Sequence, residues 1–259
     1  MFLLGSQFGQ PRSWIRNEIK FPGDFWRGKR GQHAKMVQEW LNLHGHGLAI
    51  DGDFGAITER NIAAFQKASR LSSHGRVDAA TFAALTAPMR AALAPLARPP
   101  RSFGATVLAF GKQHLAQHPR EIGGQNRGPW VRMYMQGHQG RDWPWCAGFV
   151  TFLMEQAAQQ RGERIPILGS FSCDTLAAQG KDAGRFLSER GLDTGDISEG
   201  ALFLVRRTAT DWTHVGLVEK AEAGLFSTLE GNTNDDGHRE GYEVCTRHRG
   251  YRAKDFIRL

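Results

Sequence analysis

Three short apolar runs near the C-terminal end constrain the fold more than any other feature of the sequence. GALFLVRR (200–207), HVGLVEKA (214–221) and GLFSTLEGN (224–232) are β-branched or apolar and are separated by turn residues. This pattern predicts consecutive antiparallel strands. Upstream of position 160 the apolar residues recur instead at helical spacing. The sequence therefore predicts the α+β class, with an antiparallel sheet in the C-terminal part.

A segment rich in proline, alanine and arginine divides the chain. TAPMRAALAPLARPPRS (86–102) holds four of the ten prolines, a composition typical of a linker, although its start could be helical. We predict an N-terminal domain at 1–86 with its core at about 30–86, a linker at 87–102, and a second domain at 103–259. Both domains have ordinary sizes.

Composition and charge limit the class of protein. No apolar run approaches the roughly 18 residues of a membrane helix, so no membrane span is predicted. The start MFLLGSQFGQPRSW has no basic region and its apolar run ends after four residues, so we expect synthesis in the cytoplasm without a cleaved signal. The net charge of +7 favours polyanions such as nucleic acid, acidic membranes or an anionic cell wall. The basic residues are scattered, however, and no nucleic-acid partner is predicted.

The N-terminal part contains three helical patterns. In QHAKMVQEWLNLHG, the apolar residues Val37, Trp40 and Leu41 share one face. Two further helices are predicted, in GAITERNIAAFQKASR with a candidate N-cap at Thr58 and in VDAATFAALT with a candidate N-cap at Asp78. The N-terminal domain is therefore expected to be a small three-helix unit.

Neither a metal nor a cofactor is predicted. The turn that begins at Asp51 resembles a calcium loop, but its twelfth position is Ile62, where an EF-hand needs glutamate. We therefore interpret it as a turn. His238, Cys245 and His248 match no familiar zinc spacing. The glycines of EIGGQNRGP follow no strand and do not form a GxGxxG dinucleotide fingerprint.

Residues 37–85 resemble the peptidoglycan-binding modules of the three-helix type. Those modules show an LN-x-x-G helix end, a DG-x-FG-x-x-T loop, an FQ pair and a G-x-V-D/G-x-x-T-x-x-A-L tail. The matching residues here are Leu41, Asn42, Gly45, Asp51, Gly52, Phe54, Gly55, Thr58, Phe65, Gln66, Gly75, Val77, Asp78, Thr81 and Leu85, whereas Asn61 and Ile62 stand where the family usually has Ala and Val. The resemblance implies a wall-binding domain with bacterial peptidoglycan as partner. A purely structural helical unit is the alternative, and no glycan-contacting residue is assigned.

Cys146 lies where a helix is expected to begin. In RDWPWCAGFVTFLMEQAA, Pro144 precedes the cysteine, and Ala147, Val150 and Leu153 form an apolar stripe. The first turn of a helix favours an anion and lowers the pKa of a thiol there. Free cysteine is also among the most buried residue types. Position alone leaves two interpretations open, a nucleophile or a small buried hydrophobe.

Two residues of the predicted strands could complete a nucleophilic site. His214 opens its predicted strand, and Thr228, Glu230 and Asn232 share a face of the next one. A hairpin could bring His214 close to Glu230 or Asn232. A cysteine, a histidine and a residue that orients the imidazole are what an activated thiol requires.

Residues from about 103 to 259 resemble the CHAP family of cysteine, histidine-dependent amidohydrolases and peptidases. The family motifs W-C-A-x-F-V, H-V-G-x-V and E-G-N match WCAGFV, HVGLV and EGN, and EIGGQNRGP resembles an upstream loop found in part of the family. The resemblance implies a papain-like fold with the nucleophile helix packed on an antiparallel sheet. It implies Cys146 as nucleophile, His214 as general base and acid, Glu230 as the residue that orients the imidazole, and Asn232 as a further polar member.

Together the two resemblances imply a hydrolase that cleaves an amide of the peptidoglycan peptide. N-acetylmuramoyl-L-alanine amidase and peptidoglycan endopeptidase both fit, and the alternative is a non-catalytic wall-binding protein with a degenerate hydrolase domain. We expect a phage endolysin or an antibacterial effector that reaches the wall by release or by secretion machinery, with an immunity protein as a further candidate partner. Trp143, Trp145 and Trp212 could line the cleft or belong to the core.

Overall fold

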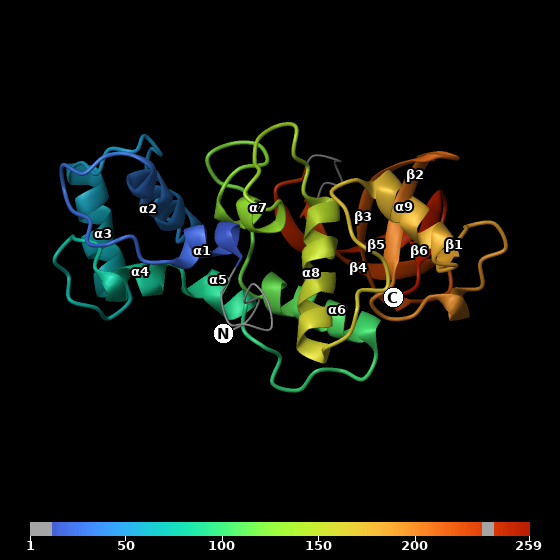
Figure 1. Cartoon of the computed structure of the whole chain (residues 1–259). Helices are drawn as coiled ribbons and strands as arrows, with labels where there is room; N and C mark the ends of the chain where they lie inside the picture. The colour runs from blue at the N-terminus through green and yellow to red at the C-terminus, as the bar shows by residue number, and fades with distance from the viewer. Residues whose placement is uncertain (1–11, 235–240) are drawn as a thin grey trace.

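The computed structural model describes residues 12–234 and 241–259, and Figure 1 shows a helical part joined to a part built around one sheet. This arrangement confirms the predicted α+β class. The helices are α1 (Ser13–Ile19), α2 (Gln32–Leu43), α3 (Ala56–Ala68), α4 (Ala79–Leu85), α5 (Ala87–Ala92), α6 (Phe103–Leu115), α7 (Pro129–Tyr134), α8 (Cys146–Arg161) and α9 (Cys173–Asp182). The strands are β1 (Phe186–Leu187), β2 (Leu202–Thr208), β3 (Asp211–Ala221), β4 (Leu225–Thr233), β5 (Glu243–Gly250) and β6 (Lys254–Ile257).

The three predicted N-terminal helices are present as α2, α3 and α4. Asp78 caps α4 as predicted, because its carboxylate accepts the backbone N–H of Thr81 at 2.8 Å. The predicted N-cap at Thr58 is wrong, since α3 begins at Ala56 and its N-cap is Gly55. The Thr58 hydroxyl is instead buried and donates to the carbonyl of Asp53 at 3.4 Å.

The turn between α2 and α3 is held by one amide side chain. Gln38 donates to the carboxylate of Asp51 at 2.7 Å and to the carbonyl of Asp53 at 3.0 Å, and it accepts the N–H of Gly52 at 2.8 Å. Gly52 has a φ of +77°, which favours glycine. The Asp51 carboxylate also accepts the N–H of Asp53 at 2.8 Å. These contacts agree with the interpretation of this stretch as a turn.

The segment predicted as a linker begins as a packed helix. Its residues 87–92 form α5, in which Met89 and Ala92 are buried. Gln113 of α6 and Gln156 of α8 both donate to the carbonyl of Ala92, at 3.1 and 3.0 Å. Two apolar side chains and two hydrogen bonds therefore fix the start of the segment to the second part of the chain.

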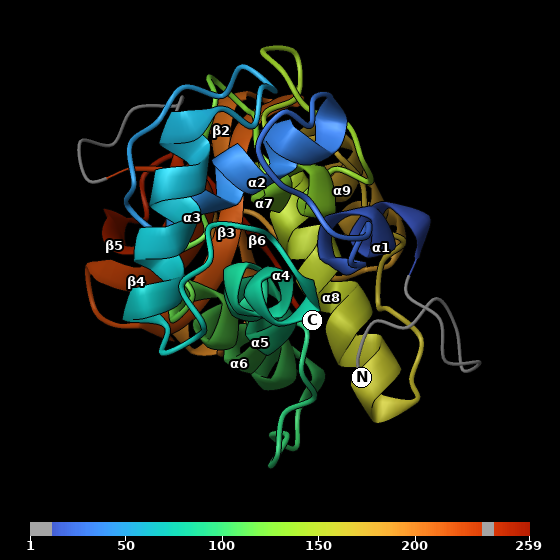
Figure 2. The ribbon, with the colours of Figure 1, turned by 90° about the vertical axis from the view of Figure 1, so that its left-hand side faces the viewer.

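A buried ion cluster joins the helical part to the part that contains the sheet. Arg132 of α7 donates to Glu18 of α1 at 2.6 Å and to Glu39 of α2 at 2.7 Å, and all three side chains are buried. Beside this cluster, the rings of Trp40 and Trp130 meet at 6.3 Å. Figure 2 shows the helices of the first part placed directly in front of α7 and α8. The two parts therefore share one continuous core.

The sheet has six antiparallel strands in the order β1-β6-β2-β3-β4-β5. The three strands predicted from the sequence are β2, β3 and β4 at its centre. Helices α6 and α8 pack on one face, which carries Val215 and Leu217 of β3. The opposite face carries Val218 with Phe203 and Phe226. This alternation along β3 agrees with the predicted strand period.

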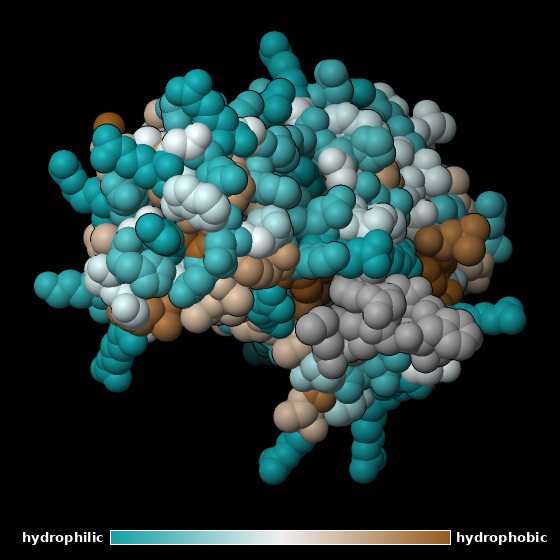
Figure 3. All heavy atoms as spheres, turned by 60° about the vertical axis from the view of Figure 1, so that its left-hand side comes forward, coloured by the Kyte–Doolittle hydropathy of each residue, from teal (hydrophilic) through white to brown (hydrophobic). Residues whose placement is uncertain are grey.

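The described part of the chain also bears on membrane and surface properties. Between 12 and 234 and between 241 and 259, no helix is long and apolar enough to cross a membrane. Figure 3 shows that the face bearing the helical part is mostly hydrophilic, with long polar side chains projecting around its edge. Two large apolar side chains of this part are exposed, Trp26 and Ile57.

Candidate active site

Cys146 is the first residue of α8, as its predicted position in the first helical turn requires. Pro144 and Trp145 end the preceding loop, and Trp145 is the N-cap residue of α8. The apolar residues that follow pack the helix against the sheet. Gly148 lets the first turn approach α7, because a Cβ at that position would lie 2.3 Å from the sulfur of Met135. Cys146 is 5% exposed, so its side chain is almost completely buried.

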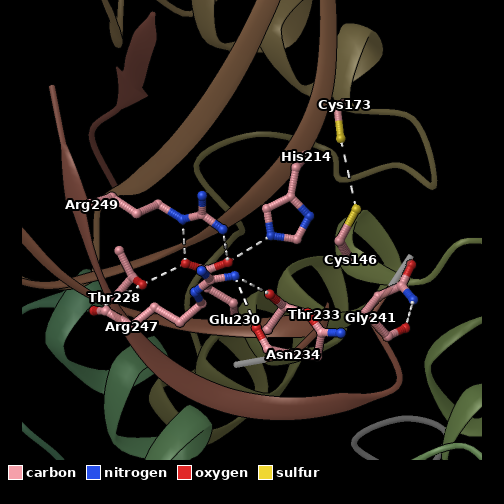
Figure 4. Close-up of polar contacts among 11 residues, drawn as sticks. Cys146, Cys173, His214, Thr228, Glu230, Thr233, Asn234, Gly241, Arg247 and Arg249 are labelled. Carbon is pink, nitrogen blue, oxygen red and sulfur yellow. Dashed lines mark hydrogen bonds and ion pairs between the residues drawn. The ribbon is translucent and has the colours of Figure 1, made fainter. Parts of the chain in front are cut away.

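His214 faces Cys146 from the sheet. It is the fourth residue of β3 rather than the first, because the strand already begins at Asp211. Its imidazole lies between the Cys146 thiol and the carboxylate of Glu230, as Figure 4 shows. The Nε2 atom is 2.8 Å from a carboxylate oxygen of Glu230, and the imidazole is close enough to the Cys146 thiol for each group to shift the pKa of the other. The structure thus brings together three of the four predicted site residues.

Glu230 is 0% exposed and is held by four contacts to its two oxygens. Besides His214, Arg249 of β5 donates Nε to one oxygen and Nη2 to the other, both at 2.6 Å. The hydroxyl of Thr228 donates to the first oxygen at 2.5 Å. Gly216 leaves space for this carboxylate, since a Cβ there would lie 2.9 Å from Cγ of Glu230. The carboxylate is therefore fixed in place and in orientation.

The electrostatics favour a charged pair of Cys146 and His214. The hydrogen bond with Cys173 lowers the pKa of Cys146 most, burial raises it, and the contact with His214 lowers it further. Burial alone would lower the pKa of His214, but its contacts with Cys146 and Glu230 raise it to about 9. Burial alone would raise the pKa of Glu230, yet Arg249 and His214 hold it well below its ordinary value. The arrangement therefore favours a thiolate beside an imidazolium.

Asn232, the fourth predicted site residue, lies elsewhere. The register of β4 against β5 shifts between Glu230 and Thr233, and Asn232 has a φ of +55°. Its side chain therefore leaves the face that carries Glu230 and accepts the N–H of Trp145 at 3.0 Å. Its amide also donates to the carbonyl of Gly241 at 2.7 Å. Asn232 thus holds the residue before Cys146.

The upstream loop EIGGQNRGP reaches the same point. Glu121 accepts the indole N–H of Trp145 at 2.9 Å and the backbone N–H of Asn126 at 2.8 Å. The amide of Asn126 donates to the carbonyl of Arg141 at 3.2 Å, and its oxygen accepts from Asn232 at 3.3 Å. The loop and Asn232 together fix the backbone from which α8 begins.

Sequence reasoning missed two residues that touch the site. Arg249 stands on a strand that has a weak apolar pattern, so no signal connected it with Glu230. Cys173 is the first residue of α9, and its sulfur lies 3.9 Å from that of Cys146. The helix itself could have been found, because Ser172 is a strong N-cap residue and its hydroxyl accepts the N–H of Thr175.

The tryptophans near the site divide between core and surface. Trp145 and Trp212 are buried, so they belong to the core. Trp143 is partly exposed, stacks on His138 at 4.1 Å and meets the edge of Phe171 at 6.2 Å. Of the three tryptophans considered from the sequence, Trp143 is therefore the one available to a bound molecule.

The three residues considered as zinc ligands from the sequence are His238, Cys245 and His248. His238 lies outside the described residues, and Cys245 and His248 are both on β5. Within the described ranges, no group of three or more His, Cys, Asp or Glu side chains is placed to hold a metal ion.

Comparison with known families identifies one segment of the chain. Residues 30–85 match the family model described as a putative peptidoglycan binding domain. A comparison with curated proteins gave no match. The family match covers α2, α3 and α4, and it supports a peptidoglycan-binding module in this part and association of the protein with the cell wall.

Proposed function

We propose that this protein hydrolyses an amide bond in the peptide part of bacterial peptidoglycan. The observation that carries the proposal is the buried series Cys146, His214 and Glu230, in which His214 lies beside the thiol and is hydrogen-bonded to Glu230, in a chain that also contains a peptidoglycan-binding module. The start of α8 packed on an antiparallel sheet is also the arrangement that the resemblance to CHAP domains leads us to expect.

The first half of the reaction is attack by sulfur. The Cys146 thiolate adds to the amide carbonyl carbon, and the carbonyl oxygen becomes an oxyanion. Backbone N–H groups at the start of α8, including that of Cys146, stabilise this charge, because the positive end of the helix dipole lies there. One such donor typically contributes about 10²–10³ in rate. The protonated His214 then gives its proton to the leaving amine as the carbon–nitrogen bond breaks.

The second half of the reaction releases the acyl group. His214, now neutral, takes a proton from water, whose oxygen attacks the thioester carbon and expels the Cys146 thiolate. Glu230 holds the imidazole in the orientation that both steps need. Asn232 acts one residue away from the sulfur, because it fixes the N–H of Trp145 and with it the start of α8.

The rigid attachment of the wall-binding module favours this substrate. Because α7 packs against α1 and α2 and also contacts α8, binding of α2–α4 to the wall would hold the thiol at a constant place near the polymer. The effective concentration of the thiol at the wall surface would therefore rise, although no new contact to the scissile bond is made.

Digestion of purified sacculi tests the proposal. Wild type and Cys146→Ala are incubated with sacculi, and the soluble fragments are identified by mass spectrometry. Wild type should release fragments, and Cys146→Ala should release at least about 10³-fold fewer, because the nucleophile is lost. Asp142→Ala, an exposed change on the loop before the helix, serves as the matched control and should cleave as wild type does.

The new ends decide between the bonds. A free amine on L-alanine together with an unsubstituted muramic acid indicates an amidase, whereas a free amine within the stem peptide or the cross-bridge indicates an endopeptidase. Equal release by wild type and Cys146→Ala would exclude the cysteine mechanism. Binding of wild type to sacculi without any cleavage would favour the non-catalytic wall-binding protein.

A further inference from the structure

We infer that Arg249 is a positioning residue of this site: its guanidinium fixes both oxygens of Glu230 and supplies the positive charge that lets Cys146 remain a thiolate opposite a protonated His214. The inference rests on the proposed function, which needs that thiolate, and names a further residue on which it depends. The order of the residues in Figure 4, from Arg249 through Glu230 and His214 to Cys146, motivates it.

The guanidinium of Arg249 and the carboxylate of Glu230 form a two-pronged contact, called the fork below. Arg249 donates Nε and Nη2 to the two different oxygens of Glu230, each at 2.6 Å. Two parallel bonds from a planar group fix the plane of the carboxylate as well as its position. The same guanidinium lies 5.3 Å from the centre of the Phe203 ring, which keeps it over the sheet. Because Oε2 also binds Nε2 of His214, the fork sets where the imidazole stands.

The net charge of the buried cluster depends on Arg249. In the resting state Cys146 and Glu230 are negative, and His214 and Arg249 are positive, so the four charges alternate and sum to zero. Cys146, His214 and Glu230 are buried, where an uncompensated charge is costly. Without Arg249 the cluster would carry one net negative charge. Uptake of a proton by Cys146 removes that charge, so losing Arg249 should convert the thiolate into a thiol.

Other charged groups also lie near Arg249 and Glu230. Lys254 of β6 lies within electrostatic range of Arg249 and Glu230, but its Nζ donates to the carbonyl of Arg252 at 2.9 Å. Glu189 is paired with Arg206.

Arg247, two residues before Arg249 on β5, has different hydrogen-bond partners, which Figure 4 draws. It donates to the hydroxyl of Thr233 at 3.3 Å and to the carbonyl of Asn234 at 2.9 Å. Arg247 is therefore a matched control for Arg249. It has the same chemistry on the same strand, but its side chain donates to Thr233 and Asn234 instead of Glu230.

Alkylation of Cys146 measures the thiolate without any substrate. Full-length wild type, Arg249→Gln, Arg249→Lys and Arg247→Gln are treated with iodoacetamide over a range of pH, and modification of the peptide that contains Cys146 is followed by mass spectrometry. At neutral pH, Arg249→Gln should react about tenfold more slowly than wild type, because the buried cluster then has a net negative charge that proton uptake by Cys146 removes, and it should regain its reactivity at higher pH. Arg247→Gln should follow wild type.

Arg249→Lys separates charge from orientation. It keeps the positive charge but loses the fork, so it should retain most of the alkylation rate at neutral pH while cleaving sacculi more slowly than wild type. If Arg249→Gln fails to fold, as judged by circular dichroism, this variant decides: behaviour like wild type in both assays overturns the inference.

The outcomes also separate this inference from the proposed function. If wild-type Cys146 reacts readily at neutral pH and Arg249→Gln has the same pH profile, the role of Arg249 is wrong and the mechanism survives. If wild-type Cys146 reacts only in the range of an ordinary thiol, the thiolate mechanism itself is wrong.

Discussion

At the scale of single residues, the site depends on which group carries a proton. The contact with Cys173 and the nearby His214 lower the pKa of Cys146, and Cys146 and Glu230 raise the pKa of His214, so the form with a negative sulfur and a positive imidazole is favoured. Glu230 stays ionised because Arg249 neutralises it, and so it cannot take the proton of His214. The proton is therefore held on the imidazole, from which the leaving amine must receive it.

The pH dependence of cleavage follows from this pair. The active form exists above the lowered pKa of Cys146 and below the pKa of His214, which is about 9. Activity should therefore fall as the pH rises through about 9, since His214 then loses the proton that the leaving amine needs. The rate of sacculus cleavage at subsaturating substrate, measured across this range, checks the expectation. A cleavage rate that already falls near the ordinary histidine pKa of 6.5 would contradict this expectation.

At the scale of elements, a second histidine joins three helices. His114 of α6 is fully buried and lies 2.8 Å from the hydroxyl of Tyr134 of α7 and 2.8 Å from the amide oxygen of Gln156 of α8. The amide oxygen can only accept, so the ring proton is on Nε2, and Nδ1 accepts from Tyr134. Burial lowers the pKa of His114 to about 4. The helix that begins with Cys146 is thus fixed to its neighbours by a neutral imidazole.

Acid should weaken this contact. Because the folded-state pKa of His114 lies below the ordinary value of 6.5, the contribution to stability is full above about 6.5 and is lost as the pH falls toward 4. The difference of about 2.5 units corresponds to a loss on the order of 3 kcal/mol. Urea unfolding at several pH values should show this loss in wild type and a smaller one in His114→Gln. Equal pH slopes in the two proteins would refute the assignment.

At the scale of the whole molecule, the wall-binding module and the candidate active site belong to one packed body. Arg132 is enclosed by two carboxylates from the module side, Glu18 and Glu39. Burial alone would lower the pKa of Arg132, but its contacts with Glu18 and Glu39 raise it, so the guanidinium stays charged. The position of Cys146 relative to the peptidoglycan-binding module is therefore set by packing.

Breaking this ion cluster should be costly. Arg132→Ala leaves two buried carboxylates without their partner and should lower the free energy of unfolding by about 3–5 kcal/mol. Lys112→Ala, which removes a largely exposed ion pair with Glu219, should cost less than about 1 kcal/mol. Urea unfolding measures both. Arg132→Met combined with Glu18→Gln and Glu39→Gln should recover most of the loss, and no recovery would mean that packing rather than charge explains it.

Local sequence determined much of this protein. The apolar period predicted the central strands and the helices α2, α3, α4 and α8, although α3 begins before the predicted cap at Thr58 and β3 begins before His214. The first-turn position of Cys146 and the strand that carries His214 also follow from local pattern. These features depend on neighbours within a few residues, so a one-dimensional pattern suffices to predict them.

Only the tertiary structure decided which side chains meet. The sequence left open whether Glu230 or Asn232 approaches the imidazole, and a shift in strand register places the oxygen of Asn232 on the N–H of Trp145. Arg249 and Cys173 reach the site across the sheet and from another helix, and α5 joins the core although its composition is that of a linker. Register, close packing and burial arise from contacts between residues distant in sequence. The chemistry of Cys146 is therefore suggested by its own helix, but its protonation is set by residues that only the fold brings near.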